Sequence, residues 1–182
     1  MDKIQNPWLQ VPGYSCPGCS PTNEKGLKLQ FWEECDDIVS YWQPELSYQS
    51  WKNTLHGGIQ CMMLDEVAGW VVFRKLQTMG VTSRIDTKYI KPMTIVDKVE
   101  MRARITKRMR QVVFIESELW QNGELCTCAE VTYFCSTPEF TCREYGFKGC
   151  FLEKDIQPLS SYQVSPRIYS EEDEKEECEA PK

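Results

Sequence analysis

The amino-acid sequence predicts an α+β domain in which an antiparallel β-sheet wraps around one long central helix. Two observations lead to this prediction. Residues 59–80 form a stretch that is too long for a strand and apolar around most of a helix circumference. Shorter segments with alternating apolar residues stand on both sides of it, two before and four after.

The two strands expected before the helix lie in the segment GLKLQFWEECDDIVSYWQPE. Apolar and polar residues alternate over residues 27–31, a turn follows at 35–37, and residues 38–42 return as the second strand. A loop over 46–55 then leads to the helix, which is expected to follow a glycine pair and to end at Gly80.

The segments after the helix alternate in the same way and predict strands rather than further helices. Asn122 and Gly123 form the strongest short hairpin signal and stand between the last two of these segments. The four strands are expected at residues 84–90, 99–105, 112–120 and 125–135.

The composition divides the chain into four parts. Residues 1–26 read as an N-terminal loop segment that contains a C-x-x-C motif, and residues 27–137 form the main domain. Residues 138–169 are expected to be a C-terminal extension that begins with a short helix. Residues 170–182 are acidic and are expected to be a disordered tail.

The bulk composition narrows the class of protein. A net charge of −6 argues against nonspecific binding to nucleic acid. The N-terminus lacks the apolar stretch of a secretory signal, and no run of about 18 apolar residues predicts a membrane span. We therefore expect a soluble, cytoplasmic protein without a membrane partner, whose ten cysteines are mostly reduced and buried in the core.

The C-x-x-C motif, Cys16 and Cys19, is compatible with half of a zinc site or with a redox pair. A structural zinc ion needs four ligands, and neither a second C-x-x-C nor a pair of histidines completes the set. A loop without metal is therefore the favoured interpretation, and no metal or other cofactor is expected. Stoichiometric zinc in the purified protein would indicate the alternative.

The run LHGGIQCMMLDE carries the only histidine of the chain, a glycine pair and two adjacent acids. On a helix, Asp65 shares its face with apolar residues, whereas Glu66 lies toward the edge of the polar arc. An ionised carboxylate among apolar neighbours is costly unless it is compensated. This pattern favours Asp65 as the functional acid, with a surface or structurally hydrogen-bonded carboxylate as the alternative.

The order and spacing of several motifs resemble the hotdog-fold thioesterases of the PaaI-like type. The resemblance rests on LHGG at 55–58, LDE at 64–66, the strand entry GVTSRIDTKYIKPM and the order of elements up to residue 135. The opening SCPGCSPTNEKGLKLQF also resembles that of one branch of the family, although Ser20 and Glu24 differ from it. The loop before the glycines, YQSWKNTLHGG, lacks the Gly and Pro-Gly turn that is common in the family. The resemblance therefore does not fix the substrate specificity.

The resemblance implies an enzyme that hydrolyses acyl-coenzyme A thioesters to free acid and thiol. It assigns Asp65 as nucleophile or general base, which the sequence does not decide, and the backbone N–H of Gly57 as oxyanion donor. His56 is expected to position the loop or the substrate rather than to transfer a proton. Gly58, Glu66 and Thr82 are expected to contact the substrate, although a plain strand threonine is equally compatible with the pattern.

The spacing of Gly57 and Asp65 bears on assembly. Eight residues along one helix separate them by about 12 Å, whereas both must lie within about 3 Å of one reacting group. Two antiparallel helices related by a twofold axis can supply one residue each. We therefore expect a homodimer or a dimer of dimers.

Basic residues are concentrated in one region of this acidic chain. Between residues 84 and 110 there are nine Lys or Arg and three Asp or Glu. The strand turn that carries Lys107, Arg108 and Arg110 is a candidate contact for the phosphates of coenzyme A. For any single basic residue, a place on a solvated strand face or in an ion pair is an equally good explanation.

A protein of another class remains open on the sequence alone. A noncatalytic hotdog protein that binds an acyl or aromatic ligand would use the same fold, because function depends on the site. The unusual loop over residues 49–54 is the feature that favours this binder.

Overall fold

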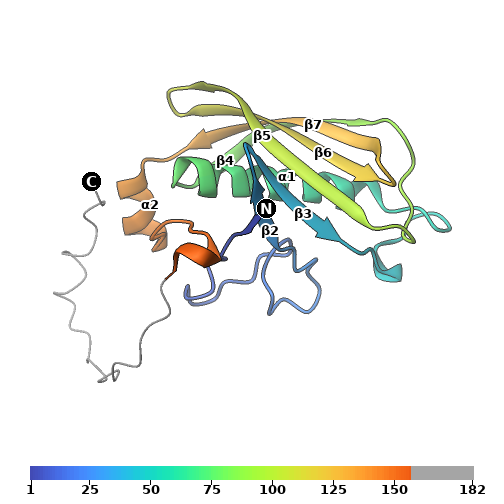
Figure 1. Cartoon of the computed structure of the whole chain (residues 1–182), viewed down its shortest axis with the longest axis horizontal. Helices are drawn as coiled ribbons and strands as arrows, with labels where there is room; N and C mark the ends of the chain where they lie inside the picture. The colour runs from blue at the N-terminus through green and yellow to red at the C-terminus, as the bar shows by residue number, and fades with distance from the viewer. Residues whose placement is uncertain (157–182) are drawn as a thin grey trace.

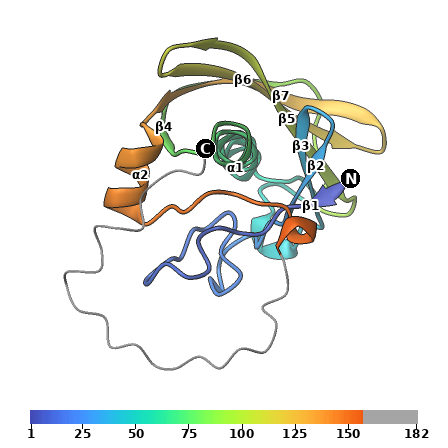
Figure 2. The same cartoon turned by 60° about the vertical axis from the view of Figure 1, so that its left-hand side comes forward.

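The computed structural model describes residues 1–156, in which one seven-stranded antiparallel sheet curves around the helix α1 (Gly57–Leu76) (Figure 1). Seen along its axis, α1 lies in the concave side of the sheet (Figure 2). In spatial order the strands are β1 (Asp2–Lys3), β2 (Phe31–Glu34), β3 (Asp37–Trp42), β5 (Val99–Met109), β6 (Val112–Gln121), β7 (Glu124–Cys135) and β4 (Gly80–Tyr89). The predicted α+β architecture is confirmed.

The core lies between α1 and the sheet because both present apolar side chains to the same layer. Alternate residues of β5 and β6 point inward, as the burial of Met101 and Ile115 shows, and they meet Leu64 and Val67 of the helix. Full burial of each such side chain contributes roughly 1.5–3 kcal/mol. The same packing fixes the rotation of α1, and therefore the direction in which its two acids point.

The end of α1 differs from the prediction. The helix ends at Leu76, and Gln77 follows in the left-handed region with a φ of 51°. The Gln77 side chain accepts a hydrogen bond from the Cys150 N–H and donates one to the Cys150 carbonyl, both at 2.9 Å. This contact from far along the chain stabilises a conformation that usually needs glycine, so Gly80 begins β4 instead of ending the helix.

The first strand is also displaced. Leu27 and Leu29 are buried as their alternation predicts, but β2 begins only at Phe31. The N–H groups of these two leucines donate to the carbonyls of Pro17 and Gly18 at 2.8 and 2.9 Å. The alternation correctly predicted that Leu27 and Leu29 point inward. Their backbone N–H groups, however, bind the N-terminal segment and not a neighbouring strand.

The later strands agree with the prediction to within a few residues, except that β4 and β5 are longer. Asn122 and Gly123 have φ values of 53° and 77°, which is the backbone that a two-residue hairpin with a type I′ turn requires. Arg110, with a φ of 56°, takes a left-handed conformation at the tip of the β5–β6 hairpin.

The N-terminal segment and the stretch after β7 together cover the side of α1 that the sheet leaves open (Figure 2). Trp8 packs edge-on against Phe73 of α1 and also contacts Phe147, with ring centroids 5.3 and 5.2 Å apart. The expected short helix is α2 (Pro138–Tyr145), which begins at a Thr137 cap. The predicted acidic tail, and the extension beyond residue 156, lie outside the described residues.

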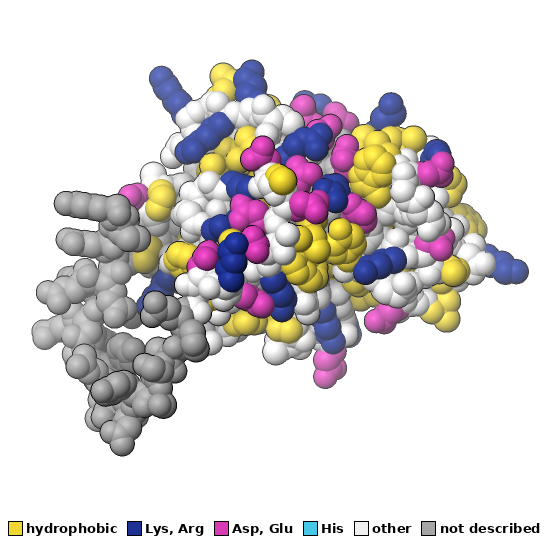
Figure 3. Space-filling model, in the orientation of Figure 1, with side chains coloured by type: hydrophobic (Ala, Val, Ile, Leu, Met, Phe, Trp, Pro, Cys, Tyr) yellow, Lys and Arg dark blue, Asp and Glu magenta, His cyan; other side chains and the backbone are white. Residues whose placement is uncertain are grey.

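Within residues 1–156, no helix combines the length and the apolar character needed to cross a membrane. Cysteines with free thiols include Cys16, Cys19, Cys35, Cys61, Cys126, Cys128, Cys135 and Cys150. Cys142 in α2 is disulfide-bonded and departs from the expectation of reduced thiols. Acidic and basic side chains are interspersed on the face that shows β2, β3 and β5 (Figure 3).

Candidate active site

The helix α1 begins with an arrangement that leaves one backbone N–H free. His56 is the N-cap, and its Nδ1 accepts the Gly58 N–H at 2.9 Å. The His56 carbonyl accepts the N–H groups of Ile59 and Gln60 at 3.0 and 3.1 Å. The hydrogen bonds of residues 1–156 thus satisfy three of the first four N–H groups and leave that of Gly57 without an acceptor.

Because the Nδ1 of His56 accepts a hydrogen bond, this nitrogen carries no proton in the observed arrangement. The imidazole is exposed and shapes the start of the helix. Gly57 is held from the other side, where the Tyr89 hydroxyl donates to its carbonyl at 2.8 Å. The structure therefore places His56, Gly57 and Gly58 together at the helix start.

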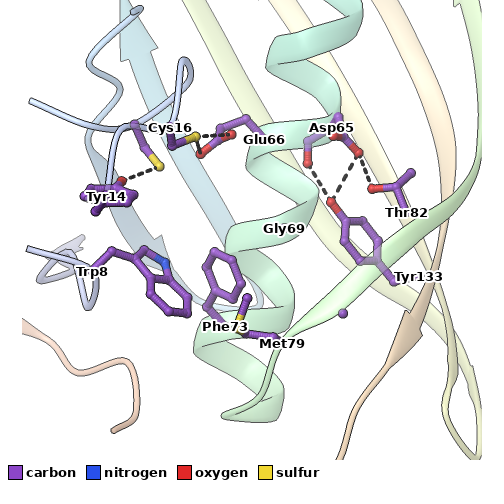
Figure 4. A pocket seen from close by; sticks show the side chains of 12 residues that line it. Trp8, Tyr14, Cys16, Asp65, Glu66, Gly69, Phe73, Met79, Thr82 and Tyr133 are labelled. Atoms are coloured by element: carbon purple, nitrogen blue, oxygen red, sulfur yellow. Dashed lines mark hydrogen bonds between the residues drawn. The ribbon is translucent and has the colours of Figure 1, made fainter. Parts of the chain in front are cut away.

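Asp65 lies two turns later and faces β4 and β7 (Figure 4). Its Oδ1 accepts hydrogen bonds from the Thr82 hydroxyl at 2.6 Å and from the Tyr133 hydroxyl at 3.2 Å. The Tyr133 hydroxyl also lies 3.0 Å from the Asp65 carbonyl oxygen. No hydrogen bond to Asp65 Oδ2 arises from the described residues, so this oxygen is available to a further group.

Thr82 and Tyr133 converge on one carboxylate because they are directly paired across β4 and β7. Paired residues in an antiparallel sheet point to the same face, which here is the face toward α1. Gly69 makes room for the phenol, since a Cβ at this position would lie 3.2 Å from the Tyr133 hydroxyl. Burial raises the pKa of Tyr133 above its ordinary value, which keeps the hydroxyl protonated as a donor.

Glu66 occupies a different environment from the one predicted. The polar edge of the helix, where the sequence pattern places Glu66, is covered by the N-terminal segment. The Cys16 Sγ lies 3.4 and 3.6 Å from the two carboxylate oxygens, and the Trp70 indole N–H donates to Oε1 at 3.2 Å. Burial raises the pKa of Glu66 to about 7.

The two thiols of the C-x-x-C motif lie beside Glu66 and have opposite character. A hydrogen bond with the Cys19 thiol, the largest effect, lowers the pKa of Cys16 to about 5. The same hydrogen bond and burial raise the pKa of Cys19 far above its ordinary value. The Tyr14 hydroxyl completes this group at 2.8 Å from the Cys19 Sγ.

Both acids border one cavity of about 320 Å³ (Figure 4), a volume at the lower end of the range of small-molecule sites. Asp65, Thr82 and Tyr133 form one polar wall, and Glu66 with the two thiols forms another. Trp8, Phe73 and Met79 supply apolar surface. The cavity can therefore hold a group that is apolar at one end and reacts at the other.

The structure does not bring Gly57 and Asp65 of one chain together. Both residues belong to α1, so the helical rise separates them by about 12 Å. One chain thus contains the free N–H and the hydrogen-bonded carboxylate, but not at one place.

The basic region divides into two groups. Four of its residues form ion pairs within 3.0 Å: Arg84 with Asp86, Lys91 with Glu124, Arg102 with Glu34, and Arg104 with Glu116. Lys107, Arg108 and Arg110 stand at the exposed β5–β6 hairpin and form no ion pair with any described residue. Lys88 and Lys98 also form no ion pair within residues 1–156, so three of the five unpaired basic residues of this region stand at the hairpin.

The register of the sheet connects the hairpin to Asp65. Arg108 pairs with Val113, Val113 with Tyr133, and Tyr133 with Thr82. Neighbouring strands are about 4.8 Å apart, so Arg108 lies roughly 14 Å from Thr82 along this row. Burial raises the pKa of Cys135, and the positive charge of Arg108 opposes this rise, which agrees with an Arg108 side chain on the same face as Tyr133.

Residues 52–128 match the family model described as the thioesterase superfamily. This segment, which includes α1 with both acids and the strands β4, β5 and β6, is similar to that superfamily. The hotdog fold implied by the resemblance is confirmed. An uncharacterised protein of Schizosaccharomyces pombe is 33% identical over 89 residues, which cover 48% of this chain and 47% of that protein.

Solved structures share the fold at low sequence identity. A thioesterase superfamily protein is similar with a TM-score of 0.61 and 18% identity, over 65% of this chain and 62% of the other. A hypothetical thioesterase of Streptococcus pneumoniae, solved with coenzyme A, has a TM-score of 0.56 and 19% identity, over 59% and 88% of the two chains. The matched part spans about half the length of the yeast relative.

The site contains residues that sequence reasoning missed. Tyr133 was read only as part of a strand, although its phenol contacts the candidate acid. Gly69 was noted only as a member of the apolar face. The alternation of inward residues in β7 marks Tyr133 as buried, but only the pairing of β7 with β4 shows that it meets Asp65.

Proposed function

We propose that this protein is an acyl-coenzyme A thioesterase of the PaaI-like type, which hydrolyses a thioester to a free acid and coenzyme A. The observation that carries the proposal is the Asp65 carboxylate, held by two hydroxyl donors at the wall of a partly apolar cavity in a hotdog fold. A carboxylate held in this way is suited to attack or to activate water.

The contacts of Asp65 suggest how it would act. Thr82 and Tyr133 hold Oδ1, which leaves Oδ2 to face the thioester carbon or a water molecule. As a base, Asp65 takes a proton from water while the oxygen attacks the carbonyl carbon, and the proton passes to the departing thiolate. As a nucleophile, it displaces the thiolate and forms an anhydride, which water then cleaves. Both routes yield the same products.

The oxyanion that develops in either route needs a positioned donor. The free N–H of Gly57 at the positive end of α1 is suited to this task, and Gly57 has no side chain of its own to shield it. Because one chain holds this N–H and Asp65 too far apart, we assign the donor to Gly57 of the partner subunit. Each site would then combine residues from two chains.

The edge of the sheet supports such a dimer. β4 is a ten-residue edge strand, and most of its residues are exposed in the single chain. Val81 and Tyr89 are 66% and 53% exposed, which is unusual for large apolar side chains on a long unpaired edge. Pairing of two β4 strands would cover this edge and bring the two α1 helices side by side. A dimer or a dimer of dimers satisfies this arrangement.

The hairpin with Lys107, Arg108 and Arg110 is the proposed contact for the phosphates of coenzyme A. Its cations lack ion-pair partners among the described residues, and the Arg108 row leads across the sheet to Thr82. The similar streptococcal protein was solved with coenzyme A, which supports this class of substrate. The acyl group would occupy the cavity beside the apolar surface of Trp8, Phe73 and Met79.

The proposal is tested by Asp65→Asn in a hydrolysis assay over short, long and aromatic acyl-coenzyme A substrates. The substitution preserves size but removes the base or nucleophile, so we expect kcat to fall by at least about a hundredfold for every substrate that the wild type turns over. Asp36→Asn, in the exposed β2–β3 turn, is the matched control and should retain wild-type turnover.

Two outcomes contradict the proposal. Tight binding of coenzyme A thioesters without turnover by the wild type would indicate the noncatalytic binder instead. Wild-type turnover in the folded Asp65→Asn variant would remove Asp65 from the reaction.

A further inference from the structure

The C-x-x-C motif is completed in space by a third side chain that can bind metal. The Cys16 Sγ, the Cys19 Sγ and a Glu66 carboxylate oxygen all lie within 4.8 Å of one another. The sequence alone offers only two ligands, because Glu66 comes from α1, far along the chain. Folding brings these three groups together at one wall of the cavity.

The distances fit the dimensions of a tetrahedral zinc site. With Zn–S bonds of about 2.3 Å and Zn–O bonds of about 2.0 Å, two sulfurs lie about 3.8 Å apart and a sulfur lies about 3.5 Å from an oxygen. The Cys16 Sγ is 3.4 and 3.6 Å from the Glu66 oxygens. The Cys19 Sγ lies within 4.8 Å of the Cys16 Sγ and of a Glu66 carboxylate oxygen.

The backbone around the motif is built for this approach. The Gly18 N–H donates to the Cys16 Sγ at 3.3 Å, a contact that stabilises a thiolate. A Cβ at Gly18 would lie 2.4 Å from the Glu66 carboxyl group, so only glycine permits the loop to come this near. The loop is also tied down, since Pro17 and Gly18 accept the N–H groups of Leu27 and Leu29.

Within residues 1–156, no cationic side chain forms an ion pair with Glu66. The Glu66 carboxylate contacts the thiols of Cys16 and Cys19 and the Trp70 indole, and the Tyr14 hydroxyl lies next to Cys19. A buried carboxylate is usually paired with a cation or coordinates a metal. Two sulfur ligands and one oxygen ligand favour a zinc-like ion over Mg²⁺ or Ca²⁺, which prefer oxygen alone.

We propose that Cys16, Cys19 and Glu66 bind one Zn²⁺ ion, with water at a fourth position open to the cavity. Binding would release the thiol protons and fasten the N-terminal segment to α1. This site goes beyond the proposed hydrolysis and does not depend on it. It also departs from the expectation of no metal, because the fold provides the third ligand.

The test is a titration of the reduced full-length protein with Co²⁺, a probe whose thiolate bonds absorb in the near ultraviolet and whose tetrahedral sites absorb in the visible. We expect both bands to saturate at one equivalent and to disappear when Zn²⁺ is added. Cys16→Ser and Glu66→Gln should each weaken Co²⁺ binding by at least about a hundredfold. Cys35→Ser, at an exposed free thiol, is the matched control and should bind as the wild type does.

Three results would overturn the zinc site. These are the absence of thiolate-to-cobalt bands in the reduced wild type, unchanged binding by folded Cys16→Ser, and loss of binding in Cys35→Ser. If a ligand variant fails to fold, the wild-type titration still shows whether the thiolates bind the metal ion. A thermal scan supplies a second readout, because Zn²⁺ should raise the Tm of the wild type but not that of Glu66→Gln.

Discussion

At the scale of single residues, the two adjacent acids show how position on one helix turn separates roles. Asp65 faces two hydroxyl donors from the sheet, whereas Glu66 faces two thiols from the N-terminal segment. The helical pattern favours Asp65 as the functional acid, and this assignment stays a prediction. The same pattern was not sufficient to place Glu66, because the irregular segment that covers this face has no periodicity to read.

The role of the hydroxyl donors can be measured separately from that of the acid. Tyr133→Phe and Thr82→Val each remove one hydrogen bond to Asp65 Oδ1, so we expect kcat to fall about tenfold with little change in KM, because the loss concerns orientation rather than binding. Tyr145→Phe, at an exposed tyrosine of α2, should leave both constants unchanged. If KM rose about tenfold instead and kcat did not change, the hydroxyl groups would act in substrate binding.

At the scale of elements, the regular parts of the fold could be predicted and the irregular contacts could not. The alternation in β5, β6 and β7 and the Asn122–Gly123 turn are local signals, and they led to the observed strands. The end of α1 depends on Cys150, and the start of β2 depends on Pro17 and Gly18. Such long-range hydrogen bonds leave no pattern in the nearby sequence.

The β5–β6 hairpin makes a prediction of its own. Arg108→Glu together with Lys107→Glu should raise KM for an acyl-coenzyme A by about fivefold or more, because each lost charge contact is worth up to about 1 kcal/mol, while kcat changes less. A thioester that lacks the nucleotide should be hydrolysed as before. Lys98→Glu, at the opposite end of β5, is the control for a change of charge. Equal losses on both substrates would exclude a phosphate contact.

At the scale of the whole molecule, the described chain has a central helix, a sheet with one exposed edge and a second layer of irregular backbone. Over residues 52–128 the sheet and helix match the model of the thioesterase superfamily. The exposed edge at β4 and the distance between Gly57 and Asp65 both support the proposed dimer. In the proposed arrangement, a single chain would hold two halves of a site, and a dimer would hold two whole sites.

The central claim, that each site takes Gly57 from one chain and Asp65 from the other, is tested by mixing two inactive variants. Gly57→Pro removes the proposed donor at the first helical position, where proline is well tolerated, and Gly57→Ala, which keeps the N–H, is its control. Asp65→Asn supplies the other defect.

Equal amounts of Gly57→Pro and Asp65→Asn are unfolded together and refolded, and subunit exchange is confirmed by mass spectrometry. Random pairing makes half of the dimers mixed, and each mixed dimer holds one intact site and one doubly altered site. The account predicts that about a quarter of all sites regain activity. A mixture that exchanges subunits and stays inactive would contradict it, because every site built from a single chain keeps one defect.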